Sequence, residues 1–353
     1  MMLGLKMRKV LALVVALAML VALTGCSGNS DKKVLYVYNW GDYIGEGVIE
    51  LFEQETGIDV IYSMFETNED MYTKIKSTNG GNYDVIFPSD YIIQKLISED
   101  LLAEINYDNI PNMSLIDDKY KDLAFDPGNK YSVPYMWGTV GILYNTELTT
   151  TEIDSWTDLW DPTYTRNILM MDSMRDSIGL TLKMLGYSVN SASVAELDEA
   201  KEKLIEQKPI VLAYVNDQVK DQMIAGEAAL AVIYSGDAST VMEYNENIQY
   251  VVPQEGSNIW FDNMCILKTS QHKEEAEMFI NFMCRTDIAE MNRDYINYSS
   301  PQREVYENLP DDIKTDPTQY PDDSIYEKCE VYEDLGEMTS IYDEYWTVIS
   351  ASY

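Results

Sequence analysis

The pattern of apolar and polar positions predicts alternating strands and helices from the start of the acidic part of the chain. Residues Val34–Trp40 are mostly apolar, β-branched or aromatic, a composition that favours a strand. Val48–Thr56 has the spacing of an amphipathic helix, and Gly57 follows it as a typical helix end. Further strands are expected at 58–62 and 83–87, and further helices at 71–76 and 91–100. Strands that alternate with short helices predict βαβ units and a parallel sheet.

A second α/β run is predicted after an aromatic, turn-rich stretch at 131–138, which we interpret as a crossing between two domains. A new strand is expected to start at 141–145. Strands are then expected at 168–171, 211–214 and 230–234, with helices at 194–206 and 215–225. The stretches 251–253 and 259–267 indicate a return to the first domain. The last part should contain a helix at 274–284 and be mostly helical over 323–352.

The N-terminal segment has the order of parts found in a secretory signal. Lys6, Arg8 and Lys9 precede a 14-residue apolar run, Val10–Leu23, and small residues follow. A bilayer core needs about 20 apolar residues, so we favour a signal over a permanent membrane anchor. The ending Leu23-Thr24-Gly25-Cys26 resembles the bacterial lipobox.

These features predict a signal peptide over residues 1–25 and a polar tether over 26–31. A lipid on Cys26 would anchor the exported protein to the outer face of the cytoplasmic membrane. In a Gram-negative cell this places the protein in the periplasm.

The rest of the chain is strongly acidic and long enough for two domains with separate cores. Residues 1–25 hold three of the 25 basic residues and none of the 60 acidic ones, which leaves 22 against 60 and a net charge of −38. Such a charge argues against nucleic acid or an anionic membrane surface as partner. It is compatible with a cationic ligand, although solubility explains most of these charges.

Histidine and cysteine are too sparse for most catalytic or metal sites. The chain has one histidine, His272, and three cysteines beyond Cys26, far apart and without a CxxC motif. We expect no metal and no cofactor. The three cysteines are predicted to be small core residues, with one disulfide as the alternative.

Unusual side chains follow two of the predicted strands. The first strand ends in Trp40-Gly41-Asp42-Tyr43 and the third in Ser89-Asp90-Tyr91. Ligands of open α/β sheets bind beyond the carboxyl ends of the strands, so these residues are candidates for a binding site. The alternative is that they only cap helices and pack in loops.

Several motifs occur in order between Leu35 and about Ser350: Tyr38-Asn39-Trp40-Gly41-Asp42-Tyr43, Tyr83-Asp84-Val85-Ile86-Phe87-Pro88-Ser89, Pro134-Tyr135-Met136-Trp137-Gly138, Ile259-Trp260-Phe261-Asp262 and Ile341-Tyr342-Asp343-Glu344-Tyr345. Together they resemble the spermidine/putrescine-binding proteins of polyamine ABC transporters. The resemblance implies an α/β, two-lobed periplasmic-binding-protein-like fold of type II, with the ligand cleft between the lobes. It implies residues 32–138 with 261–306 as lobe 1 and 139–260 with 307–353 as lobe 2. It also implies a monomer without enzymatic activity that delivers its ligand to a membrane permease.

A polyamine is an apolar methylene chain with ammonium groups at intervals, and it needs aromatic walls and carboxylates. The resemblance supplies aromatic walls at Trp40, Tyr234 and Trp260, carboxylates at Asp42, Asp176, Asp237 and Asp262, and further contacts at Tyr43, Ser89, Tyr91, Tyr298 and Tyr332. Ser173 and Tyr332 depart from the pattern of spermidine-preferring members, and Asp237 matches putrescine-preferring ones. We therefore expect putrescine slightly ahead of spermidine, with a helix cap as the alternative role of Asp237.

Other functions stay open from the residues alone. The same fold could bind another cationic amine, a sugar or a ferric ion. A secreted glycosidase with two catalytic carboxylates is a further alternative, because acidic residues are plentiful. We predict that Trp156, Trp160 and Trp346 are core residues.

Overall fold

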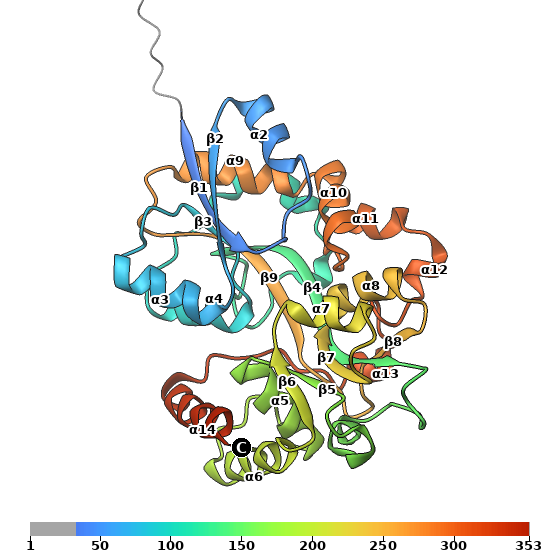
Figure 1. The fold of residues 1–353 in the computed structure, drawn as a ribbon. Coiled ribbons are helices and arrows are strands. Elements are labelled where there is room, and N and C mark those ends of the chain that lie inside the picture. The colour runs from blue at the N-terminus through green and yellow to red at the C-terminus, as the bar shows by residue number, and fades with distance from the viewer. Residues whose placement is uncertain (1–32, 353) are drawn as a thin grey trace, which may run out of the picture.

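The computed structural model describes residues 33–352, and Figure 1 shows two lobes joined by long strands. The strands are β1 (Val34–Trp40), β2 (Asp59–Phe65), β3 (Val85–Ile86), β4 (Ser132–Asn145), β5 (Ile168–Met171), β6 (Val211–Val215), β7 (Leu230–Tyr234), β8 (Ile248–Val251) and β9 (Ile259–Ile266). They form one mixed sheet in the order β2-β1-β3-β9-β4-β7-β5-β6, with β8 paired to β4. The predicted two-lobed α/β fold is confirmed.

Thirteen α-helices cover this sheet within residues 33–352. They are α2 (Val48–Thr56), α3 (Asn68–Thr78), α4 (Asp90–Ser98), α5 (Met174–Met184), α6 (Val194–Gln207), α7 (Gln218–Ile224), α8 (Ser235–Tyr244), α9 (Lys273–Met283), α10 (Thr286–Ile296), α11 (Arg303–Asn308), α12 (Asp311–Lys314), α13 (Asp323–Tyr326) and α14 (Thr339–Ala351).

The first lobe is built on the predicted βαβ units. Strand β1 pairs in parallel with both β2 and β3. Helix α2 ends at Gly57, whose φ of 71° lies in the left-handed region that glycine adopts without strain. The buried face of α2 includes Phe52, which packs edge-on against Phe279 of α9 at 5.1 Å between ring centroids. Local sequence signals and tertiary packing therefore agree in this lobe.

The two lobes share strand β4. Its residues Ser132–Thr139 pair with β9, whereas Val140–Asn145 pair with β7 and β8. The expected crossing is thus present, but the expectation of a new strand at 141 was wrong because β4 is continuous. Pro134 is tolerated in β4 since the pairing register with β9 shifts between Pro134 and Met136.

The second lobe repeats the parallel arrangement, with β5 between β6 and β7. The prediction that 323–352 is mostly helical is confirmed by α13, a 3-10 helix at Gly336–Met338 and α14, with a non-helical segment between α13 and the 3-10 helix. Glu330 in this segment exchanges backbone hydrogen bonds with the chain around Asn258: its N–H donates to Ser257, and its carbonyl accepts from Ile259. This non-local pairing brings Tyr332 to the boundary between the lobes.

Other sequence predictions have mixed outcomes. Cys265 and Cys284 are buried and Cys329 is half-buried, and all three are free thiols. The predicted signal peptide, the tether and Cys26 lie outside the described residues. Within residues 33–352, no helix combines the length and apolarity that a membrane span requires. The lobe boundaries stay a prediction, although β4 changes partners at Thr139/Val140, next to the predicted boundary.

Candidate ligand-binding site

A cavity of about 810 Å³ lies where the two lobes face each other. Short segments at the carboxyl ends of six parallel strands contribute to its lining, as expected for ligand sites of α/β sheets. These segments include Trp40–Tyr43 after β1, Glu66–Glu69 after β2, Ser89–Tyr91 after β3, Asp172–Asp176 after β5, Asn216–Asp217 after β6 and Tyr234–Asp237 after β7.

The twelve side chains predicted from the sequence all line this cavity. They are Trp40, Asp42, Tyr43, Ser89, Tyr91, Asp176, Tyr234, Asp237, Trp260, Asp262, Tyr298 and Tyr332. The structure therefore brings together residues from both lobes that lie up to 292 positions apart in the chain, between Trp40 and Tyr332. Their individual contacts with a ligand stay a prediction.

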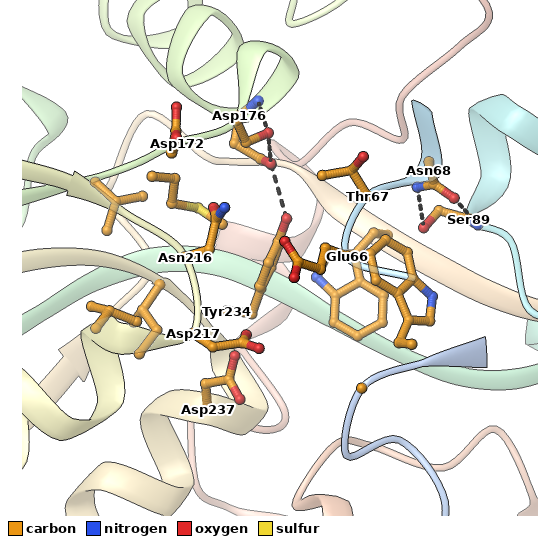
Figure 2. A pocket seen from close by; sticks show the side chains of 18 of the residues that line it. Glu66, Thr67, Asn68, Ser89, Asp172, Asp176, Asn216, Asp217, Tyr234 and Asp237 are labelled. Atoms are coloured by element: carbon orange, nitrogen blue, oxygen red, sulfur yellow. Dashed lines mark hydrogen bonds between the residues drawn. The ribbon is translucent and has the colours of Figure 1, made fainter. Parts of the chain in front are cut away.

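Asp262 on β9 is the central carboxylate of the site and is only 5% exposed. Its Oδ2 accepts a hydrogen bond from the Tyr43 hydroxyl at 2.7 Å, and its Oδ1 accepts one from the Ser89 hydroxyl at 2.6 Å. Ser89 is itself held by the Asn68 amide at 2.9 Å (Figure 2). Burial raises the pKa of Asp262 to about 6, while the two hydroxyl groups lower it.

Asp90, at the start of α4, fixes the backbone beside Asp262. Its carboxylate accepts a hydrogen bond from the backbone N–H of Phe261 at 3.0 Å and one from the backbone N–H of Tyr91 at 2.8 Å. Burial, helped by the charge of Asp262, raises the pKa of Asp90 to about 8, although the two backbone N–H groups and the Arg175 charge lower it. Because Phe261 lies between Trp260 and Asp262, Asp90 positions the strand that carries both predicted ligand contacts.

Asp176, in the first turn of α5, is surrounded by hydroxyl groups. Tyr234 donates to Asp176 Oδ2 at 2.9 Å, as Figure 2 shows, and Ser173 donates to the same oxygen at 2.5 Å. The Tyr332 hydroxyl reaches Oδ1 at 3.4 Å. Burial raises the pKa of Asp176, and these hydroxyls and the Arg175 charge lower it. This carboxylate is therefore largely satisfied without a ligand.

Arg175 supplies a cation at the same end of the cavity. Its guanidinium lies 4.4 Å from the ring centre of Tyr332 and 5.1 Å from that of Tyr91, and it donates to the Glu333 carbonyl. The Tyr91 hydroxyl donates to Glu69 at 2.9 Å. Aromatic and charged groups of both lobes thus meet here.

The aromatic walls are held by edge-on contacts and one hydrogen bond. The ring centre of Trp260 lies 5.0 Å from that of Tyr298 and 5.9 Å from that of Tyr234, with interplanar angles of 81° and 83°. The Trp40 indole N–H donates to the Phe87 carbonyl at 2.9 Å. These contacts fix the ring orientations.

Asp237 lies in the first turn of α8, and Tyr234 is the N-cap residue of that helix. The alternative role of Asp237 as the cap is therefore wrong. The ammonium of Lys220, from α7, lies 3.3 Å from Asp237 Oδ1. Asp237 therefore has a basic partner. Asp262 differs, because no basic side chain among the described residues shifts its pKa.

Sequence reasoning missed several lining residues, among them Glu66, Glu69, Arg175, Asp217 and Lys220. The strand-end rule, applied only to the first and third strands, would have found Glu66 after β2 and Asp217 after β6. Of the tryptophans predicted as core residues, Trp156 is fully buried, whereas Trp160 and Trp346 are half-buried and Trp346 lines the cavity.

The lining is acidic and aromatic. It holds eleven aspartates and glutamates against two basic side chains, together with ten tyrosines and tryptophans. Such a surface attracts a cation and can also cover apolar carbon. Within residues 33–352, no cluster of three or more His, Cys, Asp or Glu side chains is arranged to hold a metal ion.

Comparisons with known proteins agree with this fold and site. Residues 47–321 match the family model for bacterial extracellular solute-binding proteins. The chain is 35% identical over 323 residues to the spermidine/putrescine-binding periplasmic protein of Salmonella typhimurium, covering 91% of this chain and 93% of the relative.

Two solved structures extend the comparison. The spermidine/putrescine ABC transporter substrate-binding protein of Streptococcus pneumoniae is 42% identical, with a TM-score of 0.79 and coverage of 90% of this chain and 98% of that one. Lipoprotein Tp0655 of Treponema pallidum is 26% identical, with a TM-score of 0.80 and coverage of 90% and 99%.

The two lobes and the lined cleft define a solute-binding protein. The chain belongs to the family of bacterial extracellular solute-binding proteins, and the predicted similarity to polyamine-binding members is confirmed by its relatives.

Proposed function

We propose that this protein is the receptor of an ABC importer for polyamines, with putrescine as the first candidate and spermidine as the second. The observation that carries the proposal is Asp262, a buried carboxylate beside aromatic walls in a cleft with eleven acidic and two basic side chains. The names of the Salmonella and Streptococcus relatives support the same ligand class.

The arrangement suits the chemistry of a diamine. The rings of Trp40, Tyr234 and Trp260 would cover the methylene chain, and each cation–π contact contributes about 0.5–2 kcal/mol. A charge-assisted hydrogen bond to a carboxylate contributes about 1.5–3 kcal/mol, and desolvation of the ions offsets much of this. Closure of the two lobes would exclude water and strengthen the remaining electrostatic attraction.

The preference for putrescine rests on the two ends of the cleft. Ser173, where spermidine-preferring relatives often carry an aspartate, is used as the cap of α5 and donates to Asp176. Tyr332 and Arg175 occupy the same end. At the other end Asp237 offers a carboxylate for a second amine, which favours a shorter ligand.

The location and partners follow from the same proposal. Export, a lipid on Cys26 and attachment to the outer face of the cytoplasmic membrane would keep a monomeric receptor close to its permease. The lipoprotein from Treponema pallidum supports the anchored form. In this role the protein binds and releases its ligand and catalyses no reaction.

Isothermal titration calorimetry of the purified protein against putrescine, spermidine, spermine, agmatine and glycine betaine tests the proposal. We expect 1:1 binding of putrescine or spermidine, with a change in tryptophan fluorescence on closure. Absence of heat with every polyamine would show that the ligand class is wrong.

A further inference from the structure

Lys220 is an unexpected basic residue in an acidic cleft. It lies on α7 and lines the cavity together with Asp237 of α8. The Lys220 ammonium is 3.3 Å from Asp237 Oδ1, and the side chains are 26% and 20% exposed. The pair is therefore partly shielded from water but still accessible from the cavity.

Two more carboxylates act on this lysine. Burial alone would lower the pKa of Lys220, yet Asp237 and Asp217, and more weakly Asp42, raise it above its usual value. Asp217 stands at the start of α7, and its charge raises the pKa of Asp237 (Figure 2). Asp42 comes from the loop after β1 in the other lobe, with a φ of 48°. Carboxylates of both lobes thus stabilise the charged form of Lys220.

We propose that Lys220 is an internal ammonium that competes with one amine of the ligand for Asp237, and is therefore a specificity-determining residue of this cleft. The inference rests on the proposed polyamine function. A lysine side chain ends in a primary ammonium on a four-carbon stem, which matches one ammonium group and the four-carbon spacer of putrescine. No basic side chain among residues 33–352 shifts the pKa of Asp262, so a first amine can bind there without displacing one of these cations.

This competition affects only ligands with a second cation. A monoamine seated at Asp262 leaves the Lys220–Asp237 pair intact. A diamine that reaches Asp237 must displace the Lys220 ammonium or share the Asp237 carboxylate with it. The free energy of the Lys220–Asp237 ion pair is then lost from the binding free energy of the diamine. Lys220 would therefore lower the affinity for diamines relative to a protein with a neutral residue at this position.

The test is calorimetry of putrescine and of butylamine with wild type and Lys220→Met, which keeps most of the stem and removes the charge. We expect putrescine to bind about two- to five-fold more tightly to the variant, and butylamine to bind equally well to both. In an Asp237→Asn background, Lys220→Met should change putrescine affinity by less than about two-fold, because the shared partner is gone.

Three further variants control the experiment. Lys220→Gln is a second neutral form, and Lys220→Arg keeps the charge and should bind putrescine like wild type. Lys183→Met removes a lysine of a similar ion pair, 2.5 Å from Glu330 and away from the cavity lining, and should leave binding unchanged. If wild type binds putrescine and both neutral Lys220 variants bind it no better, the inference is wrong. If wild type binds no polyamine, the proposed function itself fails.

Discussion

Three carboxylates predicted to bind the ligand, Asp176, Asp237 and Asp262, differ in the protein groups that already bind them. Asp176 accepts hydrogen bonds from the hydroxyl groups of Ser173, Tyr234 and Tyr332. Asp237 forms an ion pair with Lys220. Asp262 accepts two hydroxyl hydrogen bonds, which leaves the remaining lone pairs for a ligand. At the residue scale, Asp262 is therefore the position where an incoming ammonium gains most.

Replacing Asp262 with Asn tests this directly. The variant keeps the shape of the side chain but loses the charge, so we expect putrescine binding to weaken by at least about 2 kcal/mol. Calorimetry measures the loss, and thermal unfolding checks that the variant is folded. Asp343→Asn removes an exposed carboxylate that also lines the cavity and should change affinity by less than about two-fold. Unchanged affinity in Asp262→Asn would show that this residue does not contact the ligand.

A binding residue could be predicted from the sequence where its position depends on neighbouring residues in the chain. Trp40 ends one strand that the sequence pattern predicts and Ser89 follows another, so their place at the cleft could be inferred. Lys220 and Arg175 could not be assigned in the same way. Their partners Asp237 and Tyr332 come from other elements, and only the packed fold brings them together.

At the scale of elements, α8 and the segment after α10 meet tightly at the cleft. Gly236 in the first turn of α8 has no room for a side chain, because an added Cβ would lie 2.3 Å from the Tyr298 ring. Tyr298 in turn packs against Trp260 at 5.0 Å. A glycine in one lobe thus sets the position of two predicted aromatic contacts.

Gly236→Ala should therefore both destabilise the protein and weaken ligand binding. Overpacking of this kind costs about 1–3 kcal/mol of unfolding free energy, and a displaced Tyr298 would loosen Trp260. Chemical denaturation and calorimetry measure the two effects. Gly41→Ala is the matched control, since Gly41 also lines the cavity but has nothing within 4 Å of an added Cβ. Equal behaviour of the two variants would contradict the prediction.

Some elements with strong local signals were predicted to the residue, and elements set by distant pairing were not. Val48–Thr56 has a helical pattern and a glycine end, and it forms the helix over that range. Strand β4 was divided in two, because its continuity comes from β9 on one side and β7 and β8 on the other. The extended chain near Glu330 was missed for the same reason, since its partner is Asn258.

At the scale of the whole molecule, several buried acids make the ligand-free cleft electrostatically unfavourable at neutral pH. Burial raises the pKa of Asp90 to about 8 and of Asp262 to about 6, and it also raises those of Glu69, Asp176 and Asp237. In the unfolded chain these carboxyls titrate at about 4. Between pH 4 and 8 the folded protein therefore binds more protons than the unfolded chain.

It follows that the free energy of unfolding of the ligand-free protein should fall as pH rises through this window. We expect a higher melting temperature at pH 5.5 than at pH 7.5, and a smaller difference when saturating putrescine supplies positive charge to the cleft. Thermal unfolding with and without ligand measures both. A double Asp90→Asn, Asp262→Asn variant should show a flatter dependence. A melting temperature that rises with pH would rule out this account.

Ligand affinity should depend on pH in the opposite direction to stability. Asp262 is ionised above its pKa of about 6, whereas a primary amine stays protonated up to about pH 10. Protons therefore compete with putrescine for Asp262 as pH falls, and affinity should be constant from pH 7 to 8 and decline below pH 6 by up to about tenfold per unit. Calorimetry across pH 5 to 8 gives the profile. Asp262→Asn should lose most of the decline, because it has no carboxyl to protonate. An equally steep decline in the variant would assign the dependence to Asp176 or Asp237 instead.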